Sequence, residues 1–150
     1  MMTQEYEGAC DCSLDRPSDS RPGSLLVAIP CQVGSLLQTH CALLDTAAEW
    51  CVLPGEIATI LGLDPTPDPD IEPLQTWFGA LSGRMERLLL TLIADEGREV
   101  QVDATFFVSS DWHYAMVVGW RGCLERTRFG LDPSAETCCF YFATKRERGI

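Results

Sequence analysis

The residues with the clearest chemical potential lie in one short segment, residues 42–53 (ALLDTAAEWCVL). An apolar run leads directly into Asp45 and Thr46, and a second apolar run follows two small residues, Ala47 and Ala48. A carboxylate at the end of a buried strand costs free energy unless it is hydrogen-bonded or has a function. The neighbouring hydroxyl can hold the loop backbone, and small residues let another chain approach closely. Taken alone, the segment also fits an Asx-type turn between two strands.

Other familiar catalytic motifs are absent from the chain. It contains no HExxH, no GxxxxGK[ST], no GxGxxG and no GxSxG. Its two histidines, His40 and His113, leave a cysteine–histidine nucleophile pair open. His40 lies within a strand pattern, however, and fits the exposed face of that strand more simply.

The cysteines could suggest disulfides or a metal site. There are eight of them, Cys10, Cys12, Cys31, Cys41, Cys51, Cys123, Cys138 and Cys139. No CxxC pair occurs, and the adjacent Cys138 and Cys139 would point to opposite faces of a strand. We expect buried or half-buried thiols in a reducing compartment, with no zinc, other metal or cofactor.

The composition is that of an ordinary soluble globular chain with an acidic surface. Apolar residues make up 46% and charged residues 22%, and no apolar run reaches the roughly 20 residues of a membrane helix. The N-terminus is acidic and lacks the apolar core of a secretory signal. The net charge of −11 disfavours nucleic acid, which needs clustered basic residues. We therefore expect a cytoplasmic protein with neither nucleic acid nor membrane as a partner.

The elements that must position Asp45 are mostly short strands. Strands are expected at residues 24–30, 36–44, 50–53, 74–80, 85–94, 99–109, 114–118, 128–131 and 137–142, and short helices at 54–63 and 120–126. Turns at 81–84 and 95–98 would join the strands from 74 to 109 into successive hairpins. Many short strands with dense turns predict an all-β barrel or sandwich.

The chain is expected to form one domain between two tails. Residues 1–23 carry Gly, Pro, Ser and Asp with few large apolar groups, which predicts a disordered or loosely attached segment. The domain is expected over residues 24–145, with a short C-terminal tail at 146–150.

Several segments, taken in order, resemble those of the retropepsin-like aspartic proteases. The family's catalytic motif is Asp-Thr/Ser-Gly-Ala after an apolar strand, and residues 45–48 are similar to it. The matching segments are residues 45–48 (DTAA), 61–63 (LGL), 76–84 (TWFGALSGR), 116–119 (MVVG) with Leu124, 129–132 (FGLD) and 139–142 (CFYF). The likeness covers roughly residues 25–143.

The resemblance implies a retropepsin-like lobe, barrel-like and closed, with a flap hairpin and one or two short helices. It also implies an aspartic endopeptidase that hydrolyses a peptide or protein substrate. One chain has one such loop, so catalysis would need a homodimer that places two copies of Asp45 on a two-fold axis. Thr46 would brace the two loops. The floor and flap residues implied to meet substrate are Ala47, Ala48, Trp77, Phe78, Gly79 and Ala80, although Trp77 and Phe78 also fit plain core packing.

Two positions depart from the family pattern. Ala47 stands where the family has Gly, and a requirement for positive φ or close backbone contact there would make Ala costly. Trp120 follows Gly119 where retroviral members carry Arg, which would replace an ionic dimer contact with an aromatic one. Two alternatives stay open, a catalytically silent dimerisation or peptide-binding module and an unrelated β-barrel domain.

Overall fold

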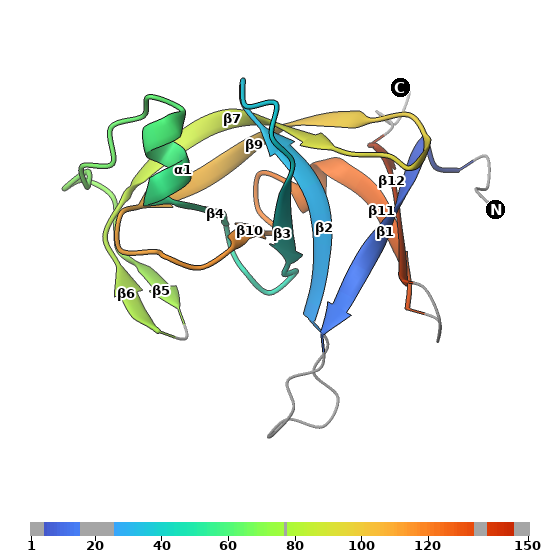
Figure 1. Ribbon diagram of the computed structural model, residues 1–150. Helices are drawn as coiled ribbons and strands as arrows, with labels where there is room; N and C mark the ends of the chain where they lie inside the picture. The colour runs from blue at the N-terminus through green and yellow to red at the C-terminus, as the bar shows by residue number, and fades with distance from the viewer. Residues whose placement is uncertain (1–4, 16–25, 77, 134–137, 146–150) are drawn as a thin grey trace, which may run out of the picture.

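Short strands make up most of the structure, a computed structural model that describes residues 5–15, 26–76, 78–133 and 138–145 (Figure 1). The strands are β1 (Gly8–Asp15), β2 (Leu26–Val33), β3 (His40–Leu44), β4 (Cys51–Pro54), β5 (Leu74–Thr76), β6 (Gly79–Leu81), β7 (Arg84–Leu92), β8 (Glu96–Gly97), β9 (Val100–Ser109), β10 (Met116–Val118), β11 (Thr127–Asp132) and β12 (Cys138–Thr144). The helices are α1 (Gly55–Ile60) and the 3-10 turn η1 (Leu124–Arg126). The predicted all-β class is confirmed. No helix among these residues is long and apolar enough to cross a bilayer.

Six strands close into a barrel. They pair in the order β2–β3–β10–β4–β9–β7, and β7 returns to pair with β2. Two of these pairings are parallel, β3 with β10 and β4 with β9. Because parallel strands end at the same edge, the residues that follow Leu44 and Val118 come together there. That edge carries the Asp45 loop.

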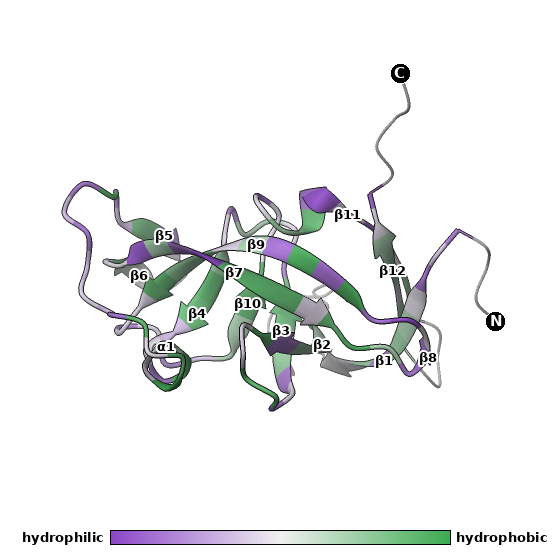
Figure 2. Cartoon of the chain, turned by 90° about the horizontal axis from the view of Figure 1, so that it is seen from above, coloured by the Kyte–Doolittle hydropathy of each residue, from purple (hydrophilic) through white to green (hydrophobic). Residues whose placement is uncertain are grey.

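Alternating burial explains why these segments form strands around one core. In β2 the side chains of Val27, Ile29, Cys31 and Val33 are buried while their neighbours are more exposed, which is the period of two of a strand with one inward face. Figure 2 shows the same alternation in part of β9, whose first five residues are alternately buried and exposed while its last four are all buried. Each fully buried Ile, Leu, Val or Phe contributes about 1.5–3 kcal/mol relative to its exposed state.

The flap hairpin lies at a different place from the one predicted. Residues 74–80 do not pair with residues 85–94. Instead β5 pairs with β6, and Thr76 lies opposite Gly79 at the end of this hairpin. The expected tip glycine, Gly83, sits against the barrel, since an added Cβ would lie 2.2 Å from the Val108 carbonyl oxygen. The glycine of the true turn is Gly79, with a φ of +109° that other residues rarely adopt.

The other predicted hairpins and helices are found. β7 pairs with β9 and β11 pairs with β12, both antiparallel. The helix predicted over residues 54–63 is shorter, Gly55–Ile60, and Gly62 follows it with a φ of +76°. The second expected helix is only the turn η1.

Residues 1–23 are expected from the sequence to form a loosely attached tail. This prediction is wrong for Gly8–Asp15, which form strand β1. This strand pairs with β12 over five residues and with the start of β2, so the folded domain begins at least as early as Gly8. Ala9 and Cys10 are buried there. The sequence of this strand, GACDCSLD, contains mainly small apolar residues, so the pattern that indicates a strand was not recognised. Residues 1–4, 16–23 and 146–150 lie outside the described part of the chain.

The expectation that the cysteines are free thiols is confirmed for six of them and wrong for two. Cys12 and Cys138 form a disulfide, with their Cα atoms 5.1 Å apart across the β1–β12 ladder. The thiols of Cys10, Cys31, Cys51 and Cys123 are buried, that of Cys139 is half-buried and that of Cys41 is exposed. Burial raises the pKa of the Cys10 thiol to about 12, which keeps it neutral.

Candidate active site

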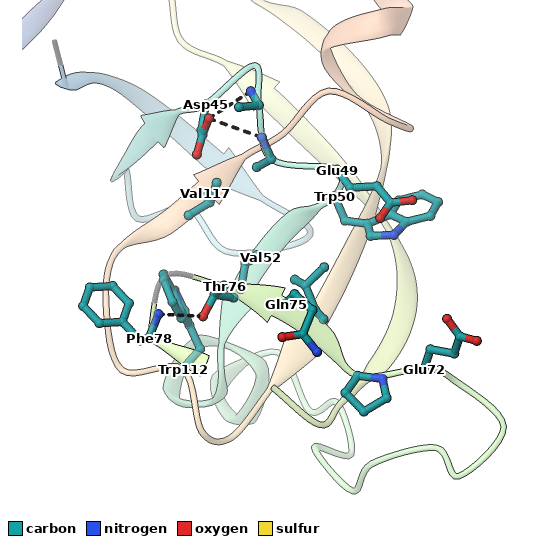
Figure 3. Close-up of a pocket in the computed structure, with 14 residues that line it drawn as sticks. Asp45, Glu49, Trp50, Val52, Glu72, Gln75, Thr76, Phe78, Trp112 and Val117 are labelled. Atoms are coloured by element: carbon teal, nitrogen blue, oxygen red, sulfur yellow. Dashed lines mark hydrogen bonds between the residues drawn. The ribbon is translucent and has the colours of Figure 1, made fainter. Parts of the chain in front are cut away.

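Asp45 follows β3 directly, and its carboxylate has one oxygen held and one open. Its backbone N–H donates to the Val118 carbonyl at 3.0 Å, which fixes the loop to β10. Its side-chain Oδ1 accepts the N–H groups of Ala47 at 2.9 Å and Ala48 at 3.2 Å (Figure 3). Among the described residues nothing hydrogen-bonds to Oδ2, and the side chain is exposed. The carboxylate is therefore oriented by the backbone while one oxygen faces outward.

Ala47 adopts its place in this loop without backbone strain. None of the described residues other than glycine has a positive φ, so the left-handed conformation that would require Gly at position 47 is absent. The conformational part of the expected cost of Ala47 does not arise. What remains is the space that its methyl group takes at the exposed surface of the loop.

A second segment, Gly119 to Arg121, is hydrogen-bonded to the residues that follow Asp45. The N–H groups of Trp120 and Arg121 donate to the carbonyls of Ala48 and Glu49 at 2.9 and 2.8 Å. The approach is so close that a Cβ on Gly119 would lie 2.3 Å from the Trp50 carbonyl oxygen. A glycine is required there for space, since no other residue could let the two loops meet.

The residue after Trp120, Arg121, forms an ionic contact within the chain. The Arg121 guanidinium lies 3.2 Å from Glu49 Oε1 and 4.8 Å from the ring centre of Trp50. Both contacts are within one chain. They fasten the residues after Asp45 to the Gly119 segment, while Trp120 itself stays 45% exposed.

A groove of about 630 Å³ opens beside Asp45. Fourteen residues line it, from the Asp45 loop, β4, the segment leading into β5, the flap and the segment around β10 (Figure 3): Asp45, Ala47, Ala48, Glu49, Trp50, Val52, Glu72, Pro73, Leu74, Gln75, Thr76, Phe78, Trp112 and Val117. The groove has the size of a site for a small molecule or a few peptide side chains.

The predicted site residues fall in different places relative to this groove. Asp45, Ala47, Ala48 and Phe78 line it. Thr46 lies in the same loop with its side chain exposed and does not line the groove. The other flap predictions are Gly79 and Ala80, which are exposed in β6 and do not line it, and Trp77, which lies outside the described residues.

Sequence reasoning missed the far wall of the groove. Glu49 and Trp50 are adjacent to the Asp45 motif and could have been included on that ground. Glu72 and Trp112 sit in segments without a recognisable pattern, and only the fold brings them near Asp45.

The flap tip rests on an aromatic pair in the segment before β10. Phe78 stacks on Tyr114 with ring centres 4.4 Å apart and an angle of 19°, and it lies 6.0 Å from Trp112. The Trp112 indole N–H donates to the Ala115 carbonyl at 2.9 Å. Phe78 is 68% exposed, so the alternative of plain core packing is wrong for this residue.

Neither histidine lines the Asp45 groove. His113 is hydrogen-bonded to Glu56 at 2.8 Å, and this contact lowers the pKa of the Glu56 carboxyl. His40 is half-buried rather than on an exposed strand face, and its Nε2 has no hydrogen-bond partner among the described residues. In the same part of the chain no three His, Cys, Asp or Glu residues gather as a metal site would require.

Among solved structures, the chain is similar to the crystal structure of a retropepsin-like aspartic protease from Rickettsia conorii. The TM-score is 0.56 with 18% sequence identity, and the match covers 97% of this chain and 100% of that one. The fold is retropepsin-like. The retroviral protease-like domain of Ddi1 from Leishmania major is also similar, with a TM-score of 0.49, 15% identity and coverage of 83% of this chain and 98% of that one. No family model and no curated protein matches the sequence.

The likeness to the Rickettsia structure extends over nearly the whole fold. The match to the Rickettsia structure spans 97% of the chain, so it includes the N-terminal strand that the sequence did not reveal. At 18% identity the likeness concerns the fold. The features of this chain that bear on its chemistry are the Asp45 carboxylate and the groove beside it.

Proposed function

We propose that this chain is an aspartic endopeptidase whose catalytic pair consists of Asp45 from each of two copies. The observation that carries the proposal is the Asp45 carboxylate, with Oδ1 held by two backbone N–H groups and Oδ2 open beside a groove. Backbone donors fix the direction of a carboxylate more firmly than a mobile side chain would. Such a fixed, exposed carboxylate suits a group that must meet a water molecule and a partner.

Among the residues that the structure describes, Asp45 is the one carboxylate of this kind beside the groove. Glu49 and Glu72 also line the groove, but Glu49 is paired with Arg121, and no backbone N–H of a described residue donates to either carboxylate. Two carboxylates that face each other across a two-fold axis share a proton, since both cannot ionise easily at close range. A second copy of the chain therefore completes the site.

The chemistry of such a pair is general acid–base hydrolysis. The ionised carboxylate takes a proton from water while the water oxygen attacks the peptide carbonyl carbon. The protonated carboxyl gives its proton to the carbonyl oxygen, which yields a neutral tetrahedral diol. As the C–N bond breaks, the departing nitrogen takes the proton of the protonated carboxyl, and one diol hydroxyl gives its proton to the ionised carboxylate while its oxygen becomes the carbonyl oxygen of the new carboxylic acid. The pair again shares one proton.

The remaining predicted residues have roles around this pair. Thr46 has no side-chain hydrogen bond to the described residues of its own chain, so its hydroxyl is free to brace the partner loop. Ala47 and Ala48 form the floor. The β5–β6 hairpin is the flap, and closing it over an extended peptide would exclude water and offer backbone hydrogen bonds.

Electrostatic repulsion between two negatively charged copies opposes formation of the dimer. Two copies carry 2 × −11 = −22, so added salt or mild acid should favour association by screening or titrating the carboxylates. Trp120, exposed beside the Asp45 loop, is an apolar group suited to the contact.

The test compares the parent protein with Asp45→Asn on a diverse peptide library between about pH 3.5 and 7, where carboxyl pairs titrate. We expect cleavage by the parent and none by the variant, read by mass spectrometry. Sedimentation of both proteins at low and high salt gives the oligomeric state, and Asp45→Asn should dimerise as the parent does.

Two results would defeat the proposal. Asp45-dependent cleavage by a protein that stays monomeric at assay concentration would exclude the shared pair. If the parent protein is folded and dimeric but cleaves no peptide, the remaining interpretation is a catalytically silent dimerisation or peptide-binding module.

A further inference from the structure

The lining of the groove is one-sided in charge. Its carboxylates are Asp45, Glu49 and Glu72, and no Lys, Arg or His is among the described residues that line it. A surface of one sign favours a ligand of the opposite sign and rejects its own.

Glu72 is the carboxylate most available to a ligand. It is exposed, and it has no hydrogen bond or ion pair with any residue that the structure describes. Glu49 is less free, because its Oε1 faces Arg121 at 3.2 Å. Glu72 lies two residues before β5, so it stands at the base of the flap.

The other end of the groove is aromatic. Phe78 and Trp112 lie there, and in Figure 3 both are drawn well away from Glu72 and Glu49. Leu74, Val52 and Val117 are larger aliphatic members of the lining. The groove thus offers Phe78 and Trp112 at the flap tip and Glu72 at the flap base, while the third aromatic residue of the lining, Trp50, is drawn beside Glu49.

We propose that the groove selects extended peptides with an apolar or aromatic side chain at the Phe78–Trp112 end and a basic side chain at Glu72. This inference rests on the proposed function, since it treats the groove as the peptide site. A Lys or Arg at Glu72 gains a charge-assisted hydrogen bond, which strengthens when the peptide and flap cover it. An acidic residue at that peptide position meets an unpaired carboxylate and is rejected.

The alternative cause of such a preference is the general field of the molecule. The chain has a net charge of −11, and Asp68 and Asp70 lie in the same acidic segment as Glu72. Long-range attraction would favour any basic peptide, irrespective of where its charge lies. Asp70 provides the matched control, because it is exposed, lies two residues from Glu72 and does not line the groove.

The experiment uses peptides that differ only by Arg, Gln or Glu at one position, scanned along a cleaved sequence. For the parent, we expect one position at which Arg is preferred over Gln by about tenfold in kcat/KM, the equivalent of one charge-assisted contact. Glu72→Gln should remove most of that ratio, and Glu72→Lys should reverse it in favour of Glu. Asp70→Asn should leave the ratio within about twofold of the parent, because a solvent-screened charge outside the groove contributes little.

Binding separates this inference from the proposed function. Labelled peptides of the same three kinds are titrated into the Asp45→Asn protein and into its Glu72→Gln double variant, with fluorescence anisotropy as the readout. Loss of the Arg preference in the double variant supports the inference even if no peptide is ever cleaved. Equal affinities for the Arg, Gln and Glu peptides, or an equal loss of preference in Asp70→Asn and Glu72→Gln, would overturn it.

Discussion

At the scale of single residues, Asp45 illustrates how a turn and a proposed catalytic group can share one conformation. The two N–H groups that bond to Oδ1 are those of an Asx turn, as the cautious interpretation of the sequence predicted. The same bonds leave Oδ2 open and fix its direction. Both interpretations of residues 42–53 therefore describe the same geometry, and only the groove beside it favours catalysis.

Ala47→Gly tests whether the departure from the family motif matters. The backbone at position 47 has no positive φ, so Gly relieves no strain. We expect kcat/KM to change by less than about threefold, and the free energy of unfolding to fall by about 0.5–1 kcal/mol because Gly gains more entropy in the unfolded chain. Peptide cleavage and urea denaturation measure the two quantities. A gain in cleavage of a hundredfold or so would instead mean that the methyl group obstructs the partner loop, worth about 2.7 kcal/mol.

The sequence predicted the near side of the site and missed the far side. The segment around Asp45 is recognisable because one motif places all its residues within a few positions. Glu72 and Trp112 lie 27 and 67 positions after Asp45 in the sequence. Their approach to Asp45 depends on barrel closure, which no local pattern encodes.

At the scale of elements, the flap is defined by its own hydrogen bonds more than by the strands that flank it. Thr76 Oγ1 donates to the Gly79 carbonyl at 2.7 Å and accepts the Phe78 N–H at 3.2 Å. These bonds set the turn between Thr76 and Gly79. The sequence interpretation chose Gly83 for the turn because a glycine between apolar runs is a common hairpin signal. Gly83 is required for close packing on Val108 instead, which only the tertiary structure shows.

Phe78→Ala tests whether the stack on Tyr114 holds the flap tip. An aromatic pair contributes about 0.5–1.5 kcal/mol, so its loss should accelerate amide exchange in residues 74–81 by about two- to tenfold. KM for peptides should rise, because Phe78 also lines the groove. Global stability should fall by less than about 0.5 kcal/mol, since the side chain is 68% exposed.

Leu37→Ala is the matched control for the flap variant. Leu37 is an exposed apolar residue in the turn between β2 and β3, 89% accessible and outside the groove lining. Its loss should alter neither flap exchange nor KM. Unchanged exchange in Phe78→Ala would mean that the flap is held by the β5–β6 ladder and Thr76 alone.

At the scale of the whole molecule, β1 and β12 bind the two ends of the chain together. β1 pairs with β12 over five residues and continues into pairing with β2, so it joins the terminal sheet to the barrel (Figure 1). Small residues on β1 make it hard to find in the sequence. Its place is set by the partner strand, where Phe140 and Phe142 are fully buried.

The Cys12–Cys138 disulfide should stabilise this junction strongly, because it closes a loop with a sequence separation of 126. A cross-link over so long a loop restricts the unfolded chain, and native disulfides typically contribute about 2–4 kcal/mol. We expect Cys138→Ser to lower the melting temperature by about 5–15 °C. The parent in excess dithiothreitol should melt like the variant, whereas Cys41→Ser, which removes an exposed thiol, should shift the melting temperature by no more than about 2 °C. Alkylation that finds eight free thiols in the untreated parent, with a melting temperature insensitive to reductant, would show that β1 is held by its hydrogen bonds and packing alone.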